Sequence, residues 1–230
     1  PEKDMTSMRI AHLIGRVGLG GAERLVVNLL NALVDERPTL VLTDPREGND
    51  LLSELDSRIE VLRVPVRRSR LPRDVVRLAK ALRSRRIDVL HSHMFGPSLN
   101  AALAARVGRI PGFVTSEHGR NPWKKPWHRW VERNVISRYA NVRICVSEDI
   151  RDVRRQSDRI PQDKLVVIPN GSQLGAPGSD QLHAVPEVLA VGRLIEAKDY
   201  PTLLQAASLL RDRGRRFTLK IVGDGPLRES

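Results

Sequence analysis

Short runs of β-branched and aliphatic residues alternate with helix-like segments along most of this 230-residue chain. The candidate strands are residues 9–14, 39–43, 59–64, 88–91, 112–115, 142–146 and 165–168. The helical patterns between them cover residues 22–34, 51–55, 73–83, 98–107, 126–138 and 148–155. Because such alternation makes successive strands parallel and puts helices on both faces of the sheet, we expect an α/β protein with a doubly wound parallel sheet.

The pattern changes after residue 170. Residues 171–186 are rich in glycine and proline and read as a linker, and a new strand, helix and strand are expected within residues 187–230. We therefore expect a first domain over 1–170 and the start of a second at 187. Because roughly 45 residues cannot bury a core of Rossmann size, we expect the chain to be a fragment of a longer two-domain protein.

The formal net charge of +12 favours anionic partners, namely nucleic acid, anionic lipid or phosphorylated small molecules. Aromatic residues are only 3% of the chain and no nucleic-acid-binding motif is present, so a nucleic-acid binder ranks last. The single cysteine, Cys145, rules out a disulfide within the chain. No apolar run approaches the ~20 residues that span a bilayer, and we expect a cytoplasmic protein.

Two basic segments are suited to an anionic membrane surface. Residues 67–86 pair an apolar stripe with arginines and a lysine, and Trp123, Trp127 and Trp130 follow helical spacing among further basic residues. The alternative for 67–86 is an ordinary helix packing its stripe on the sheet. Either arrangement leaves a basic face free for peripheral contact with the inner face of a membrane.

A glycine-rich loop, residues 18–23, joins the first candidate strand to the first helix. Such a glycine loop lets backbone N–H groups approach a ligand closely at a helix N-terminus. The loop does not fit the dinucleotide fingerprint G-x-G-x-x-G, because Glu23 stands at the last glycine position. The alternative is a tight turn without a ligand.

Histidines end two neighbouring strands of the predicted sheet. His118 follows the strand at 112–115, where ligands of open α/β sheets bind, and could donate a hydrogen bond to a hydroxyl or carbonyl group. The alternative is a capping or surface histidine. For His91 and His93 we favour packing and hydrogen bonding over a metal site, since Asp88 is the only nearby carboxylate in sequence.

The second domain carries two candidate phosphate-binding features. Arg193 and Lys198 lie at a strand end and the next helix start, and two cations on one loop suit a diphosphate. Gly223 and Gly225 end the last strand and could let a ring or phosphate approach the backbone. Solvated charges and a simple turn are the alternatives.

Taken together, these segments resemble the family 4 glycosyltransferases, retaining enzymes of the GT-B fold. The matching stretches, in the family's order, are RIAHLIGRVGLGGAERLVVNLLNAL (9–33), DVLHSH (88–93), TSEHG (115–119), CVSE (145–148), VIPNG (167–171), VGRLIEAK (191–198) and IVGDGP (221–226). Each motif alone is weak, but seven in sequence are specific.

The resemblance implies two Rossmann-like domains, the first for a hydroxyl acceptor and the second for a UDP- or GDP-linked nucleotide-sugar donor. It implies that Gly20 and Gly21 approach the donor phosphates or the acceptor and that His118 lies beside the transferred sugar. It also implies that Arg193 and Lys198 hold the diphosphate without a bound metal or other cofactor. Asn170, Gly223 and Gly225 are assigned to substrate binding on the same basis.

The family carries a Glu-x7-Glu motif in its C-terminal domain, and the sequence ends before that motif would occur, so we expect part of the donor site to be missing. The implied function is retaining sugar transfer to a lipid-linked or cell-surface glycan. Two alternatives stay open: an NAD-dependent oxidoreductase, suggested by the glycine loop and Asp44, and a nucleotide-sugar epimerase of the same fold.

Overall fold

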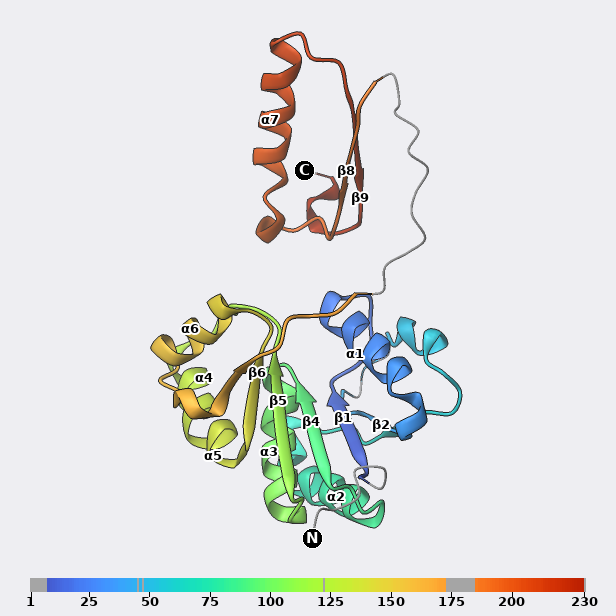
Figure 1. Cartoon of the computed structure of the whole chain (residues 1–230), viewed down its shortest axis with the longest axis vertical. Helices are drawn as coiled ribbons and strands as arrows, with labels where there is room; N and C mark the ends of the chain where they lie inside the picture. Colours follow the sequence, from blue (N-terminus) through green and yellow to red (C-terminus); the bar gives the residue numbers. More distant parts are fainter. Residues whose placement is uncertain (1–7, 45, 47, 122, 173–184, 230) are drawn as a thin grey trace. The chain divides into compact units, whose positions relative to one another are not determined.

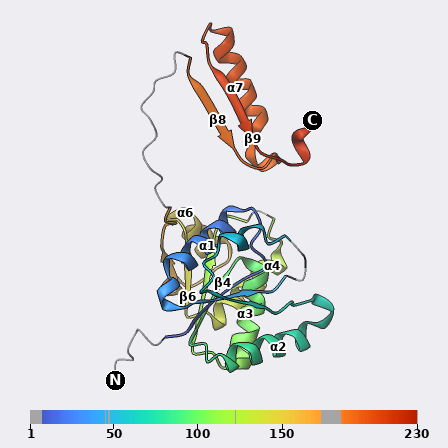
Figure 2. The same cartoon turned by 90° about the vertical axis from the view of Figure 1, so that its right-hand side faces the viewer.

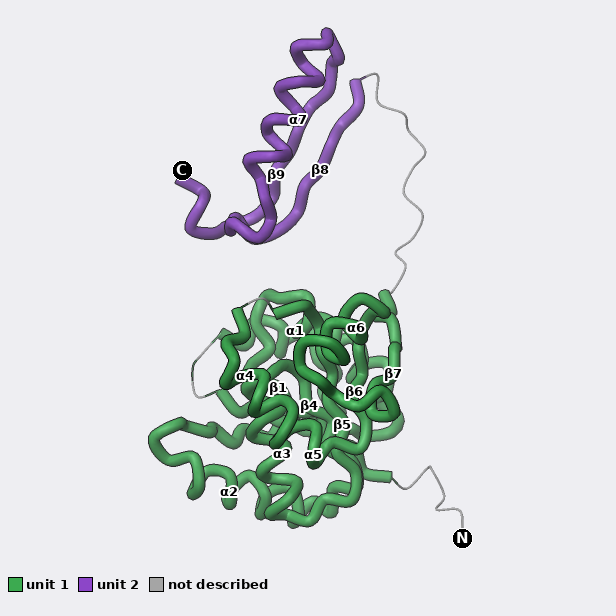
Figure 3. The backbone as a smooth tube through the Cα atoms, turned by 90° about the vertical axis from the view of Figure 1, so that its left-hand side faces the viewer, with its two compact units in different colours: residues 1–173 green, residues 174–230 purple. Residues whose placement is uncertain are grey.

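The computed structural model describes residues 8–44, 46, 48–121, 123–172 and 185–229. It separates into two compact units, residues 1–173 and 174–230, which are coloured separately in Figure 3. Most of the predicted linker, residues 173–184, lies outside the described residues. Each unit is considered by itself below.

Unit 1 is built on one seven-stranded sheet in the order β3-β2-β1-β4-β5-β6-β7, and every neighbouring pair is parallel. The strands are β1 Ile10–Ile14, β2 Thr39–Leu42, β3 Glu60–Arg63, β4 Val89–His93, β5 Gly112–Glu117, β6 Val142–Cys145 and β7 Leu165–Val167. Figure 1 shows the central strands side by side in this order. The predicted α/β fold with a parallel sheet is confirmed.

The helices of unit 1 follow the predicted segments closely. They are α1 Gly21–Ala32, α2 Leu71–Ser84, α3 Phe95–Gly108, α4 Pro126–Val131, α5 Ser137–Tyr139 and α6 Glu148–Ser157. Two predicted helices differ in detail. The segment at Asp50–Glu54 is a 3-10 turn, and a π-helical turn at Glu132–Ile136 interrupts the helix predicted over 126–138.

Two faces of the sheet carry separate apolar cores. On one face, α2 and α3 pack against β1, β4 and β5 in a cluster that includes Leu13, Leu78, Leu90, Ala102 and Phe113. On the other face, α1 covers β1 and β2, and α6 covers β6 and β7; Figure 2 shows the two sides of the sheet. Val75, Leu78 and Leu82 of the α2 stripe are buried, so the 67–86 segment does pack on the sheet, while the arginines of α2 itself stay exposed.

The alternation along the strands explains where the site falls. On β1, Ala11 and Leu13 face the α2–α3 core, so His12 and Ile14 face the other side of the sheet. On β4, Leu90 faces the α2–α3 core, which leaves His91 and His93 on the same side as His12. The middle of this face, between the α1 and α6 clusters, is therefore polar.

Unit 2 contains β8 Glu187–Val191, α7 Tyr200–Asp212 and β9 Thr218–Val222, with β8 and β9 paired in parallel. Figure 3 shows α7 alongside β8 and β9. None of its described residues is buried. A parallel pair normally needs cover on both faces, and here apolar side chains such as Leu189, Val191 and Val222 stay exposed.

Candidate functional site

The strand order reverses at the boundary between β1 and β4. The chain adds β2 and β3 on one side of β1 and adds β4 to β7 on the other. Helices from opposite faces diverge at such a switch point and leave a crevice beyond the carboxyl ends of the strands, which is where open α/β sheets bind ligands. The glycine loop follows the carboxyl end of β1, and His118 follows that of β5, the strand next to β4.

The glycine loop forms the N-terminus of α1, as the sequence predicted. Gly20 is the N-cap in extended conformation, and Gly21 is the first helical residue. The carboxylate of Glu23 folds back against Gly20 at the helix N-terminus and occupies the space that a Cβ at Gly20 would take. A Cβ at Gly21 would meet nothing within 4 Å, which leaves the backbone at that residue open to a ligand.

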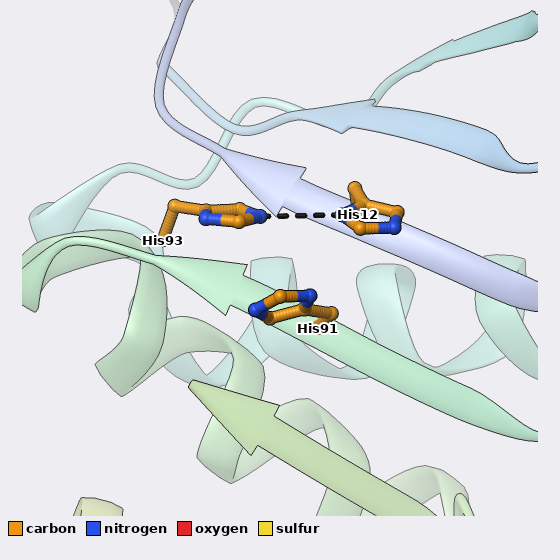
Figure 4. A group of neighbouring side chains, drawn as sticks. All are labelled: His12, His91 and His93. Carbon is orange, nitrogen blue, oxygen red and sulfur yellow. Dashed lines mark hydrogen bonds between the residues drawn. The ribbon is translucent and has the colours of Figure 1, made fainter. Parts of the chain in front are cut away.

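Four histidines gather around the switch point. His12 on β1 is aligned with His91 on β4, and its Nδ1 lies 3.2 Å from the Nε2 of His93, as Figure 4 shows. The other nitrogen of His93, Nδ1, lies 3.2 Å from the Nε2 of His118 just after β5. His91 instead places its Nε2 2.7 Å from the hydroxyl of Ser116. The hydrogen bonding favoured for His91 and His93 is thus present.

All four imidazoles are held neutral. Burial lowers the pKa of His12 to about 4. Burial, with repulsion from the neighbouring histidines, lowers the pKa of His91 and of His93 well below its usual value, and burial also lowers the pKa of His118. At neutral pH each ring therefore has one N–H donor and one lone pair.

His12, His91 and His93 are close enough to be considered as metal ligands, with candidate nitrogens within 4.8 Å of one another. The geometry between His12 and His93 argues against this. Their ring centroids are 5.5 Å apart with 3.2 Å between the facing nitrogens, so the rings meet edge to edge with both lone-pair directions on one line. A metal on that line needs about 4 Å between the nitrogens, at ~2.0 Å per bond, whereas a shared proton fits the observed gap.

A buried network of charges fixes the loop that carries His118. Glu117, the last residue of β5, accepts a hydrogen bond from Arg143 at 2.8 Å, and Lys124 lies 2.6 Å from Glu132. Arg154 and Asp158 complete a set of three cations and three carboxylates whose side chains are at most 2% exposed. Arg154 also donates to the carbonyls of Gly119 and Arg120, directly after His118.

The two glutamates of this network respond differently to it. Burial and the charge of Glu132 raise the pKa of Glu117, against the opposing effect of Lys124 and Arg143. Burial also acts to raise the pKa of Glu132, but Arg143 and Lys124 outweigh it and hold that pKa below its ordinary value. Glu132 begins the π-helical turn, and its backbone carbonyl accepts hydrogen bonds from the hydroxyl of Ser137 and from the guanidinium of Arg143.

A cleft of about 650 Å³ opens beside the switch point, lined by residues that follow the carboxyl ends of β1, β2, β3, β4 and β5. Its aromatic wall is Phe95, Trp123, Trp127 and His128, and His128 stacks on Trp127 with ring centroids 3.5 Å apart. Arg46 and Arg68 also line it. Trp123 precedes α4, which begins at Pro126, and Trp130 is exposed and does not line the cleft.

Unit 2 places Arg193 and Lys198 on the segment between β8 and α7, and both are exposed. The aliphatic part of Lys198 lies over Gly192, the residue before Arg193. Gly223 and Gly225 have a structural role: a Cβ at either would overlap a backbone carbonyl, of Gly192 and Leu194 respectively. These glycines let the two strand ends of unit 2 lie against each other.

Asn170 is exposed after β7, and no described contact joins it to the histidines. The sequence interpretation did not single out His12 or Glu117 as site residues. His12 is a histidine within an apolar run, and only the strand order brings it beside β4. The oxidoreductase alternative depends on Asp44, whose Oδ2 forms an ion pair with Nη2 of Arg46 at 2.6 Å.

The family model and the curated proteins that this chain resembles are all glycosyltransferases. Residues 19–174 match the model of Glycosyltransferase Family 4. The chain is 27% identical to EpsF of Bacillus subtilis, which is assigned as a glycosyltransferase, over 95% of the chain and 62% of that protein. It is 24% identical to the UDP-Gal:alpha-D-GlcNAc-diphosphoundecaprenol alpha-1,3-galactosyltransferase of Escherichia coli, over 96% of the chain and 63% of that enzyme.

Solved structures show the same fold. The crystal structure of HepE from Anabaena in complex with UDP and glucose matches with a TM-score of 0.78 at 19% identity, covering 95% of this chain and 61% of that one. The chain thus spans less than two thirds of the length of these relatives. No helix in the described part of the chain is long and apolar enough to cross a membrane.

Proposed function

The chain belongs to glycosyltransferase family 4, and from this we propose that the protein transfers a sugar from a nucleotide-sugar donor to a hydroxyl acceptor, with retention of configuration. The observation that carries the proposal is the carboxyl edge of the seven-stranded sheet. Along that edge lie the open backbone at Gly21 after β1, the aromatic cleft beside the switch point, and His118 after β5. We assign unit 1 to the acceptor and unit 2 to the diphosphate of the donor.

The cleft suggests the chemistry of the acceptor. Trp123, Trp127 and Phe95 offer flat apolar surfaces on which a sugar ring or a lipid chain can lie, and Arg46 and Arg68 can pair with phosphate. The Escherichia coli relative acts on an acceptor with a diphosphate and an undecaprenol chain. We propose a lipid-diphosphate-linked saccharide as the acceptor of this protein.

The donor assignment can be tested by binding. In unit 2, Arg193 and Lys198 are exposed cations on one strand-to-helix segment, so the 230-residue chain should bind UDP or GDP more tightly than NAD. Loss of one charge-assisted contact is worth roughly 1.5–3 kcal/mol, so Arg193→Ala and Lys198→Ala should each weaken nucleotide binding in isothermal titration about 10- to 100-fold.

A matched control is Arg211→Ala, which removes an exposed arginine from α7 of the same unit. It should leave the affinity unchanged. Equal affinity of all three variants and the unaltered chain for the nucleoside diphosphate would remove the donor assignment.

Two further measurements test the type of reaction. Sugar product formed without any acceptor would favour the epimerase alternative. The anomeric configuration of a transferred sugar shows whether configuration is retained.

We also propose that the basic surface of α2 and the exposed tryptophans bring unit 1 to an anionic membrane. Arg73, Arg77 and Lys80 are exposed on α2, and Trp130 is exposed on α4. Each basic residue near such a surface is worth about 1 kcal/mol, screened over ~8–10 Å at physiological salt. Co-sedimentation with phosphatidylglycerol vesicles should be strong at low salt and weak at high salt.

The control for membrane binding is charge removal at two places. Replacing Arg73 and Lys80 with glutamine should reduce sedimentation, whereas the same change at Arg215 and Arg216 of unit 2 should have little effect. Binding that ignores both salt and the α2 changes would exclude the membrane proposal without affecting the donor assignment.

A further inference from the structure

Three of the histidines form an unbranched hydrogen-bonded chain rather than a loose cluster. His12 and His93 are nearly coplanar, with an interplanar angle of 13°, and His93 and His118 are at 27°. In both pairs the centroids are about 5.4–5.5 Å apart while the facing nitrogens are 3.2 Å apart. The nitrogens therefore lie between the rings, in the geometry of two in-line N–H···N hydrogen bonds.

Such a chain couples the tautomers of its members. A neutral imidazole has a proton on only one nitrogen, and each hydrogen bond in the chain needs one donor and one acceptor. If His118 donates from Nε2, His93 must accept at Nδ1 and donate from Nε2, and His12 must accept at Nδ1. If His12 donates from Nδ1, every member carries its proton on Nδ1. Both bonds can exist only when the three rings share one tautomer.

The outer end of the chain decides between the two forms. Nδ1 of His118 is buried and has no hydrogen-bond partner among the described residues. An N–H without a partner in a buried position costs more than an unpaired lone pair. In the free protein, the form with protons on Nε2 is therefore favoured, and it leaves a buried acceptor at Nδ1 of His118.

We propose that His12 and His93 are positioning residues that hold His118 in its Nε2–H tautomer, so that its Nδ1 accepts a hydrogen bond from a hydroxyl group of the bound substrate. The identification of that hydroxyl as belonging to a sugar rests on the proposed function. The shared tautomer does not, because it follows from the distances within unit 1.

His91 provides the internal control. It lies on the same face of β4, with its ring 4.3 Å from His93 and 4.9 Å from His12 between centroids. Its Nε2 bonds to Ser116, outside the chain. Replacing His91 should therefore disturb packing near the chain without changing which nitrogens are protonated.

The test is a long-range ¹H–¹⁵N correlation spectrum of the imidazoles in the ¹⁵N-labelled 230-residue chain at pH 7.5. His12, His93 and His118 should all be neutral and carry their protons on Nε2. Any of the three found as the Nδ1–H form, as a mixture or as the cation overturns the proposal. This result does not depend on nucleotide binding or transfer, so it is separate from the fate of the proposed function.

A remote substitution tests the coupling itself. In His12→Phe, a ring fills the space but Nε2 of His93 loses its acceptor. Both forms of the remaining His93–His118 pair then leave one buried N–H without a partner, so His118 should shift from nearly all Nε2–H to a mixture of the two tautomers. In His91→Phe, the tautomer of His118 should not change. An unchanged His118 in a folded His12→Phe variant, judged by its backbone amide spectrum, overturns the proposal.

Discussion

Val41 and Val191 are both valines in parallel strands, yet Val41 is 0% exposed and Val191 is 72% exposed. The strands of both units have the same apolar character in sequence. In unit 1, helices cover both faces of the sheet and the apolar side chains form cores on each. In unit 2, one helix accompanies two strands and no described residue is buried. Strand sequence specifies the extended conformation, and the layers around it determine what stability the strand contributes.

The charges of the two units differ in the same way. Unit 1 buries Arg143 and Lys124 with Glu117 and Glu132. The ion pairs of unit 2, such as Arg211 with Asp212, are exposed. A buried charge without its partner is costly, whereas an exposed pair is worth little. The contrast therefore predicts that replacing a buried arginine of unit 1 lowers the free energy of unfolding far more than replacing an exposed arginine of unit 2.

The largest effect is expected at Arg143. Arg143→Met leaves Glu117 and Glu132 with one cation fewer in a buried site, and removal of one partner from a buried ion pair costs about 3–5 kcal/mol. The free energy of unfolding of unit 1, measured in urea, should fall by that amount. Arg211→Met in unit 2 should change it by less than about 0.5 kcal/mol. Similar losses in both variants would contradict the assigned difference in burial.

A slightly smaller loss of unfolding free energy is expected when the pH is lowered. The pKa of His12 is lowered by burial to about 4, against 6.5 when unfolded, so the unfolded state binds more protons between these values. Stability is therefore full above about pH 7 and is lost as the pH falls from ~6.5 towards ~4, by about 2–3 kcal/mol at pH 4.5 for this one group. Urea unfolding at pH 7.5 and 4.5 measures the loss.

The control for the acid effect is His12→Phe, which should show a smaller loss of stability between the two pH values. The described residues of unit 2 include no histidine, so amide signals from that unit should not report this titration. An equal pH dependence with and without His12 would mean that other groups dominate the acid response.

The smallest effects are expected from replacing two glycines, Gly223 directly after β9 and Gly21 at the start of α1. Gly223→Ala places a methyl group against the carbonyl of Gly192, and such overpacking costs roughly 1–3 kcal/mol, confined to unit 2. Gly21→Ala meets open space at the start of α1 and should stabilise unit 1 by about 0.4–1 kcal/mol. Amide signals followed on heating distinguish the units. Loss of unit 1 signals in Gly223→Ala would contradict their independence.

Much of the fold could be predicted because its signals are local. All seven strands of unit 1 follow from short aliphatic runs, and α4 begins at Pro126, where proline is tolerated in a first helical turn. The helix α3 begins at Phe95, three residues before the predicted start at residue 98, and Pro97 lies in its first turn, where proline is tolerated. The π-helical turn at Glu132 has no local signal, since it depends on partners such as Arg143.

The candidate site was only half predictable for a related reason. His118 and the glycine loop stand beyond strand ends, which sequence position reveals. His12 lies within a strand, and its importance arises from the neighbouring β4, about eighty residues away in sequence. The roles of Gly223 and Gly225 were also open in the sequence, because a glycine needed for backbone packing and one needed for a ligand look alike.

Cys145 closes β6 at the centre of the α6 cluster, fully buried, and burial raises the pKa of its thiol to about 11. It is also the only cysteine of the chain. A thiol reagent can therefore label this protein only while that part of unit 1 is open. The rate at which Cys145 is alkylated therefore reports how often this part of the seven-stranded sheet opens. The measurement needs no introduced probe and reports on unit 1 alone.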